Sequence, residues 1–138
     1  MRMRFLALAM VITVGQACDE VDACRRPQIP ESIVMLVIEH PSVKQYFHTE
    51  SPGRLPVTIS DHLLEPSMML AGFEFPVRIV PDRQLQDFQH LRFIHFRVRR
   101  REATAEFEYR SEGMHGEFTF SRMSDGAWRI LDSEVGEY

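Results

Sequence analysis

The chain lacks the short motifs that identify many enzymes and cofactor-binding proteins. Its 138 residues contain no glycine-rich phosphate loop, no Gly-x-Ser-x-Gly nucleophile motif and no His-Glu-x-x-His metal motif. The six histidines show no other close spacing of metal ligands, so neither a metal ion nor a cofactor is expected. The sequence therefore favours a protein that binds over one that catalyses, and it indicates no particular reaction.

Basic residues are in the minority. Sixteen lysines and arginines stand against twenty aspartates and glutamates, which gives a net charge of −4. Proteins that bind nucleic acid attract its phosphates with an excess of positive charge, and this chain has the opposite excess. No nucleic-acid partner is expected.

Long apolar runs are also missing. The longest, residues 5–14, is about half of what a membrane-spanning helix needs. It follows Arg2 and Arg4 and ends at Gly15-Gln16-Ala17, which is typical of a bacterial secretory signal cleaved after Ala17. We expect residues 1–17 to be removed and the mature protein, of net charge −6, to be periplasmic or extracellular without a transmembrane helix.

Cysteine is scarce, and both cysteines fall at the start of the expected mature chain. Cys18 and Cys24 either form a small disulfide loop in an oxidising compartment, or Cys18 becomes the acylated first residue of a membrane-anchored lipoprotein. Gly15 stands where such a lipoprotein signal usually has Leu, Val or Ile. Both alternatives leave the cysteines in a flexible linker, residues 18–30, ahead of one domain at residues 31–138.

Residues 31–48 carry the first structural signal. Ile33, Leu36 and Val37 recur at helical spacing, and Pro41 then interrupts the pattern. A proline is well tolerated in the first turn of a new helix, so we expect two helical pieces at an angle.

The middle of the chain, residues 51–90, is less regular. Residues 55–60 alternate between apolar and polar side chains and predict a short edge strand that includes Pro56. Residues 68–70 and 77–80 are predicted to be the two arms of a hairpin, and Pro81-Asp82 to open a turn of helix with Leu85 and Phe88.

Residues 91–138 predict four antiparallel strands joined by three tight turns at Arg100-Arg101, Glu112-Gly113 and Ser124-Asp125-Gly126. Each turn sets the residues that face one another across its hairpin. The predicted pairs are Val98–Ala103, Phe96–Ala105, Ile94–Phe107, His95–Glu106, Tyr109–Gly116, Phe107–Phe118, Ala105–Phe120, Arg122–Trp128 and Ile130–Phe120. In this register the apolar residues gather on one face of the sheet, which we call the dry face. His95, Arg97 and Glu106 lie on the opposite face and point to solvent.

A sheet with one dry face, preceded by helices, predicts an α+β domain. We expect the N-terminal helical segments to pack on a curved antiparallel sheet that ends in the four-stranded meander. The dry face would then carry the core.

A resemblance to a known family rests on three segments: residues 107–109, residues 116–120 and the closing Asp125-Gly126-Ala127-Trp128-Arg129-Ile130. In these segments the chain resembles the cone-shaped fold of nuclear transport factor two-like and cystatin-like proteins. This resemblance covers about a third of the chain, which departs from the family at Pro41 and in its long middle. It implies a pocket inside the cone more than a reaction. It also implies a possible homodimer through the outer sheet face.

Four residues near the open end of the dry face are the predicted ligand-binding site: Tyr109, Arg122, Trp128 and Asp132. Asp132, in phase with Trp128, would hold a carboxylate against aromatic rings, which can raise its pKa and suit it to general acid or base chemistry. Arg122 would stack on Trp128 or bind an anionic ligand. The alternative is that these aromatic residues are simply core.

Two functions of different classes follow. The first is an exported binding or protein-interaction module, whose acidic charge suits a basic protein partner. The second is a carrier of a small apolar ligand, or an enzyme, that uses Asp132 and Tyr109 in the cone. The arginines at residues 97–101 are expected to be surface charge, with an anionic contact to lipid headgroups or an acidic partner left open.

Overall fold

The computed structural model describes residues 26–85 and 89–138. The expected signal segment, Cys18, Cys24 and Phe88 lie outside the described residues. The helices are α1 (Glu31–Glu39), α2 (Pro41–Lys44) and the 3-10 turns η1 (Gln45–Phe47), η2 (Asp82–Gln84) and η3 (Arg110–Glu112). The strands are β1 (Val57–Ser60), β2 (Val77–Val80), β3 (Arg92–Arg99), β4 (Glu102–Tyr109), β5 (Met114–Arg122) and β6 (Trp128–Glu137).

The N-terminal helix is broken at Pro41, as the sequence predicts. His40 has an extended backbone (φ −65°, ψ 129°), which ends α1, and its Nδ1 accepts a hydrogen bond from the backbone N–H of Ser42 at 3.3 Å. This contact caps the first turn of α2, whose Pro41 needs no such partner because it has no N–H. The predicted pair of helical pieces is confirmed.

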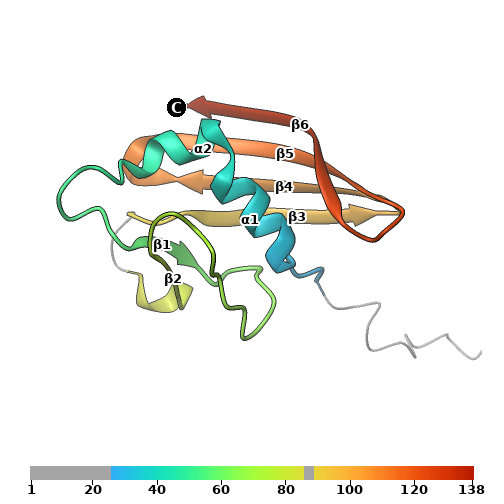
Figure 1. Cartoon of the computed structure of the whole chain (residues 1–138), viewed down its shortest axis with the longest axis horizontal. Helices are drawn as coiled ribbons and strands as arrows, with labels where there is room; N and C mark the ends of the chain where they lie inside the picture. Colours follow the sequence, from blue (N-terminus) through green and yellow to red (C-terminus); the bar gives the residue numbers. More distant parts are fainter. Residues whose placement is uncertain (1–25, 86–88) are drawn as a thin grey trace, which may run out of the picture.

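The fold class is α+β. Strands β3 to β6 form a four-stranded antiparallel sheet in sequence order, and α1 runs diagonally across one face of it (Figure 1). The buried residues of α1 are Ile33, Val34, Val37 and Ile38. They belong to the same hydrophobic core as the inward side chains of the sheet, so the helices cover the dry face.

Next to their turns, the first and third hairpins have the predicted register. Phe96 pairs with Ala105 across the turn at Arg100, which has φ 58°. Arg122 pairs with Trp128 across the third turn, where Gly126 has φ 88°, a left-handed conformation that favours glycine.

The second hairpin differs from the prediction by two residues. Tyr109 pairs with Met114 and Phe107 with Gly116, where the sequence suggested Gly116 and Phe118. The cause is a longer turn, in which η3 adds a 3-10 turn before Gly113 at φ 65°. Side chains in a strand alternate between the two faces with period two, so a shift of two residues keeps every side chain on its predicted face. The composition of the dry face is therefore the same in both registers.

Two irregularities in the sheet also depart from prediction. A register shift between Phe93 and His95 places Phe93, not Ile94, opposite Phe107. A second shift leaves Leu131 unpaired, between Ile130 opposite Phe120 and Asp132 opposite Thr119. Such an extra residue reverses the faces of the side chains that follow it.

The predicted hairpin in the middle of the chain is wrong. Residues 68–70 form no strand, and β2 pairs with β1 in parallel, with Val57 opposite Val77 and Ile59 opposite Ile79. Parallel neighbours need a crossover connection, which here is the loop of residues 61–76. A bridge between Ile59 and Leu91 joins this small sheet to the start of β3.

Candidate functional site

The four predicted site residues do not come together. Tyr109 lies at the end of β4 beside Met114, whereas Arg122 lies eight residues farther along β5. At 3.3 Å per residue this separates them by roughly 26 Å along the sheet. Tyr109 therefore belongs to one end of the domain, and Arg122 and Trp128 to the other.

Asp132 is not on the inner face. It pairs with Thr119, whose neighbours Phe118 and Phe120 are the inward residues of β5, so Asp132 faces outward and is exposed. The irregularity at Leu131 is the cause. Asp132 Oδ1 accepts a hydrogen bond from the backbone N–H of Ser133 at 3.0 Å, and the structure does not place its carboxylate against the inner aromatic rings.

The inner aromatic residues are core. Phe107, Phe118 and Phe120 have no exposed surface, and the rings of Phe107 and Phe118 meet edge to face with centroids 5.2 Å apart. These side chains are packed beneath the helices and do not line an open cone. These aromatic residues therefore fit the alternative in which they form the core and not a binding site.

Arg122 stacks on Trp128, as the sequence suggested. The guanidinium carbon of Arg122 is 5.7 Å from the centroid of the Trp128 ring, within the range of a cation–π contact. Arg122 also donates from Nε to the carbonyl of Gly126 at 3.4 Å. Both residues belong to the third hairpin, far from Tyr109.

Tyr109 borders a cavity of about 500 Å³. The cavity lies between the small β1–β2 sheet, the loop before β1 and the end of β4. Tyr109 is 6% exposed, and its ring packs on Phe47 of η1 with centroids 6.0 Å apart. The polar side chains around the cavity are those of Arg54, Thr58, Arg78, Gln84, Gln89 and Tyr109.

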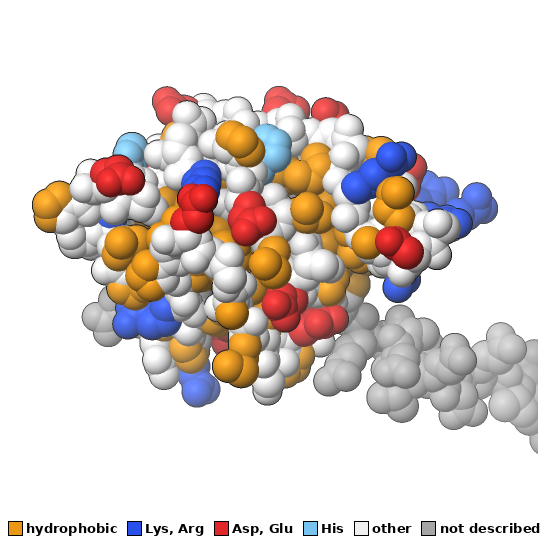
Figure 2. Space-filling model, in the orientation of Figure 1, with side chains coloured by type: hydrophobic (Ala, Val, Ile, Leu, Met, Phe, Trp, Pro, Cys, Tyr) orange, Lys and Arg blue, Asp and Glu red, His pale blue; other side chains and the backbone are white. Residues whose placement is uncertain are grey.

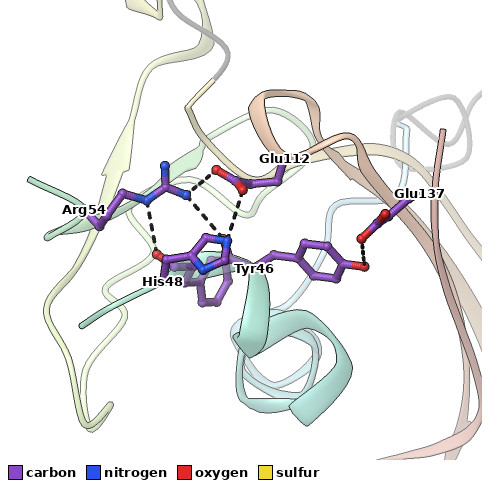
Figure 3. Close-up of polar contacts among 6 residues, drawn as sticks. Tyr46, His48, Arg54, Glu112 and Glu137 are labelled. Atoms are coloured by element: carbon purple, nitrogen blue, oxygen red, sulfur yellow. Dashed lines mark hydrogen bonds and ion pairs between the residues drawn. The ribbon is translucent and has the colours of Figure 1, made fainter. Parts of the chain in front are cut away.

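Arg54 is the most firmly held cation at this cavity. Its Nε and Nη2 donate to the backbone carbonyls of Phe47 and Tyr46 at 3.5 and 3.4 Å, and Nη2 also pairs with Glu112 Oε1 (Figure 3). The hydrogen bond that Arg54 donates to Glu112 raises the pKa of Arg54 above its usual value, against the opposing effect of burial. Within the described residues, only Nη1 of this guanidinium has no hydrogen-bond partner.

Glu112 ties three segments together at this end. Its Oε2 is 3.1 Å from Nε2 of His48, while its Oε1 pairs with Arg54 (Figure 3). The carboxylate of Glu112 is largely buried, with 18% of the side chain exposed. The turn at η3, the loop after η1 and the loop before β1 are thus held in fixed relation around the cavity mouth.

Arg78 supplies a second cation. It is exposed on β2, lines the same cavity, and has no ion pair with any carboxylate in residues 26–85 or 89–138. A guanidinium offers several N–H donors and binds carboxylates and phosphates well. The cavity lining therefore contains two arginines, whose chemistry suits an anionic group, together with Tyr109.

A second polar cluster lies under η2. The buried hydroxyl of Ser60 donates to Asp82 Oδ1 at 2.6 Å, and Arg92 Nε donates to the same oxygen at 2.9 Å. The hydrogen bond from Arg92 lowers the pKa of Asp82, although burial acts in the opposite direction. Burial, and then the charge of Arg92, lowers the pKa of the nearby His62.

This cluster is structural. A nucleophilic serine needs a base within hydrogen-bond reach and access to a substrate. Ser60 has no exposed surface, and its hydroxyl is bonded to a carboxylate, with the backbone N–H of His62 donating to it at 3.1 Å. The cluster fastens β1 to η2 and β3.

Within the described ranges, no three His, Cys, Asp or Glu side chains gather closely enough to hold a metal ion. No helix in the same part of the chain is long and apolar enough to cross a bilayer.

Of the cavity residues, the sequence singled out only Tyr109. Arg54 and Arg78 are 24 residues apart and belong to no recognisable motif, and only the parallel pairing of β1 with β2 brings their segments to one cavity. Comparisons with protein-family models, curated proteins and solved structures found no match to this chain.

Proposed function

We propose that this protein is an exported binding module, without catalytic machinery, that takes up a small anionic molecule. The observation that carries the proposal is the cavity of about 500 Å³ that Arg54, Arg78 and Tyr109 border. Export is inferred from the secretory-signal pattern of residues 1–17.

The size and chemistry of the cavity support a small polar ligand. Ligand cavities usually measure about 300–1,000 Å³, with a few polar groups that fix orientation. Here the polar groups include two arginines, and one of them is held in place by Glu112 and two backbone carbonyls. A guanidinium that is already fixed loses little conformational freedom when a carboxylate or phosphate binds to it. An apolar ligand, in contrast, would desolvate both cations without pairing them.

Within residues 26–85 and 89–138, the cavity lining offers no acid–base pair, which favours binding over catalysis. Among the described lining residues there is no histidine, aspartate or glutamate. Glu112 is not among the lining residues, and it is engaged by Arg54 and His48. A Tyr109 hydroxyl beside a guanidinium can orient a ligand oxygen.

The test is calorimetric titration of the full chain with inorganic phosphate and with citrate, alongside Arg78→Gln. We expect saturable binding of at least one anion, weakened about ten-fold or more in the variant, since a charged hydrogen bond contributes about 1.5–3 kcal/mol. Arg129→Gln is the control, because it removes one exposed arginine from β6, outside the cavity lining. No binding, or equal binding by Arg78→Gln and the wild type, would reject the proposal.

A second candidate is a protein-interaction module for a basic partner. The observation in its favour is a row of three glutamates across the outer sheet face, where Glu106 pairs with Glu117 and Glu117 with Glu134. Like charges in this arrangement repel one another, and a basic surface would relieve the repulsion. Native mass spectrometry of the tagged protein from an extract tests it: recovery of a basic protein with the wild type, but not with Glu117→Gln, is the expected result.

A further inference from the structure

Two of the hairpin turns meet at one end of the sheet. The turn between β3 and β4 contacts the end of β5, because the backbone N–H of Arg122 donates to the carbonyl of Arg101 at 2.7 Å. Arg101 Nη2 also donates a hydrogen bond to the backbone carbonyl of Arg122 at 3.2 Å. These contacts hold the first and third turns side by side at the end opposite the Tyr109 cavity (Figure 1).

This end is strongly basic in an acidic protein. We define the basic tip as residues 97–102 and 122–129. It contains six arginines against Glu102 and Asp125, a net charge of +4 in a chain of −4. The arginines are Arg97, Arg99, Arg100, Arg101, Arg122 and Arg129. Figure 2 shows the blue side chains gathered at this end of the molecule.

The described residues leave most arginines of the basic tip without an acidic partner. Among the described residues, the single ion pair that any of them makes joins Arg97 to Glu106 at 3.8 Å, with 77% of the arginine side chain exposed. The other five have no carboxylate within 4 Å in that same part of the chain. Like charges that lie this close repel one another, and an external anionic surface would remove that cost.

Apolar side chains accompany the charge. Val98 belongs to the inward face of β3, yet it is 47% exposed, and Met123 in the third turn is 40% exposed. Trp128 is half-buried beneath the guanidinium of Arg122. A tryptophan and exposed aliphatic residues among arginines match the region of a lipid headgroup, which is polar on one side and apolar on the other.

We propose that the basic tip docks on an anionic lipid surface, with its arginines on the headgroups and Val98, Met123 and Trp128 at the boundary with the acyl chains. Each basic residue close to an anionic bilayer contributes about 1 kcal/mol, so several together with an apolar contact give reversible binding. An acidic protein would satisfy the charges as well, but it would leave the apolar residues without a matching environment. The inference does not depend on the function of the cavity at the other end.

Trp128 provides the readout, because it is the one tryptophan in the chain. The full chain is titrated with vesicles of phosphatidylcholine alone and with an equal mixture of phosphatidylcholine and phosphatidylglycerol. We expect a blue shift of the Trp128 emission with the anionic vesicles, which weakens as salt is added. The apolar residues 5–14 contain no tryptophan, so any insertion of that segment does not produce the signal.

The matched pair of variants is Arg99→Gln with Arg100→Gln, against Arg26→Gln with Arg83→Gln, which lie outside both the basic tip and the cavity lining. Each pair removes two exposed arginines. Loss of about 2 kcal/mol predicts roughly 30-fold weaker vesicle binding for the first pair, and the second should stay close to wild type.

Three results would overturn the proposal. One is an unchanged Trp128 emission on the anionic vesicles. Another is equal weakening by both pairs of variants, which would indicate a general effect of net charge. The third is binding of soluble poly-glutamate as tight as binding to the vesicles and lost in the same variant, which would assign the basic tip to an acidic protein partner.

Discussion

Gly116 stands directly under the ring of Phe107, its partner on the neighbouring strand. A Cβ atom on Gly116 would lie 2.5 Å from Cζ of Phe107 and 3.1 Å from the backbone carbonyl oxygen of Glu134. Phe107 has no exposed surface, and its ring also contacts Phe93 and Phe118. The ring therefore has no space into which it can retreat, and glycine at this position is a packing requirement.

Gly116→Ala should destabilise the domain by about 1–3 kcal/mol, because the new methyl group overpacks the core. Gly136→Ala is the control, since its Cβ would meet only the His115 side chain, at 3.2 Å, and that side chain is exposed and able to move. Urea unfolding of both variants measures the difference. If Gly116→Ala is as stable as the wild type, the Phe107 ring does not occupy the position described.

Neutralising the middle of the glutamate row should stabilise the protein. Glu117 lies between Glu106 and Glu134, and directly opposed like charges on a sheet cost tenths of a kcal/mol to about 1 kcal/mol. We expect Glu117→Gln to raise the midpoint of thermal unfolding at low salt, with a smaller gain at high salt. Glu102→Gln is the comparison, because Glu102 faces Ser121 and Arg99, not another acid. An equal rise in the unfolding midpoint for both variants would show that the change in net charge, and not the row of glutamates, causes the stabilisation.

The N-cap that His40 provides for α2 should contribute about 1 kcal/mol to the free energy of unfolding. Its Nδ1 accepts from the backbone of Ser42, and its ring meets Phe118 edge to face with centroids 4.8 Å apart. His40→Ala removes the cap and the ring contact, whereas His40→Asn keeps a capping acceptor and loses the ring. Chemical denaturation should rank the stabilities as wild type, then His40→Asn, then His40→Ala. Identical values for the two variants would show that the cap contributes nothing.

Asp82 should make the fold sensitive to acid. Its pKa is lowered in the folded protein, chiefly by the hydrogen bond from Arg92, from an ordinary value of 3.8. A depressed carboxyl pKa contributes stability that is present above the ordinary value and lost as pH falls through the folded one. The free-energy difference between the wild type and Asp82→Asn should therefore shrink below about pH 3.8.

Because Asp82 is about one-third exposed, we expect its contribution to be below about 1 kcal/mol. Asp125→Asn is the control, as that residue lies in a solvent-exposed turn. Urea titrations at pH 7 and pH 3 measure both variants. A pH-independent difference for Asp82→Asn would contradict the assigned pairing with Arg92.

The regular parts of the fold were predictable because their causes are local. Pro41 breaks the helix through its own backbone, and Gly126 and the Arg100-Arg101 turn set the registers of their hairpins within a few residues. The second hairpin was off by two residues because η3 lengthens the turn before Gly113, and a sequence that reads Ser-Glu-Gly suits both lengths.

The candidate site was far less predictable. Simple alternation of side chains along β6 places Asp132 on the inner face, and this alternation fails at the unpaired Leu131. Arg54 and Arg78 carried no local signal, because their roles arise from where two loops and a parallel strand pair happen to meet. The sequence predicts Tyr109 as a site residue because it lies on the dry face. Tyr109 borders the cavity because the dry face ends there.

Alternation and turn chemistry, which act over a few residues, determined from the sequence alone that four strands end this chain and which face of them is dry. The tertiary structure decided the parallel pairing of β1 with β2, the reversal at Leu131, and the gathering of arginines at the basic tip and the cavity. These features depend on contacts between residues distant in sequence, which hydrophobic burial selects only when the whole chain packs.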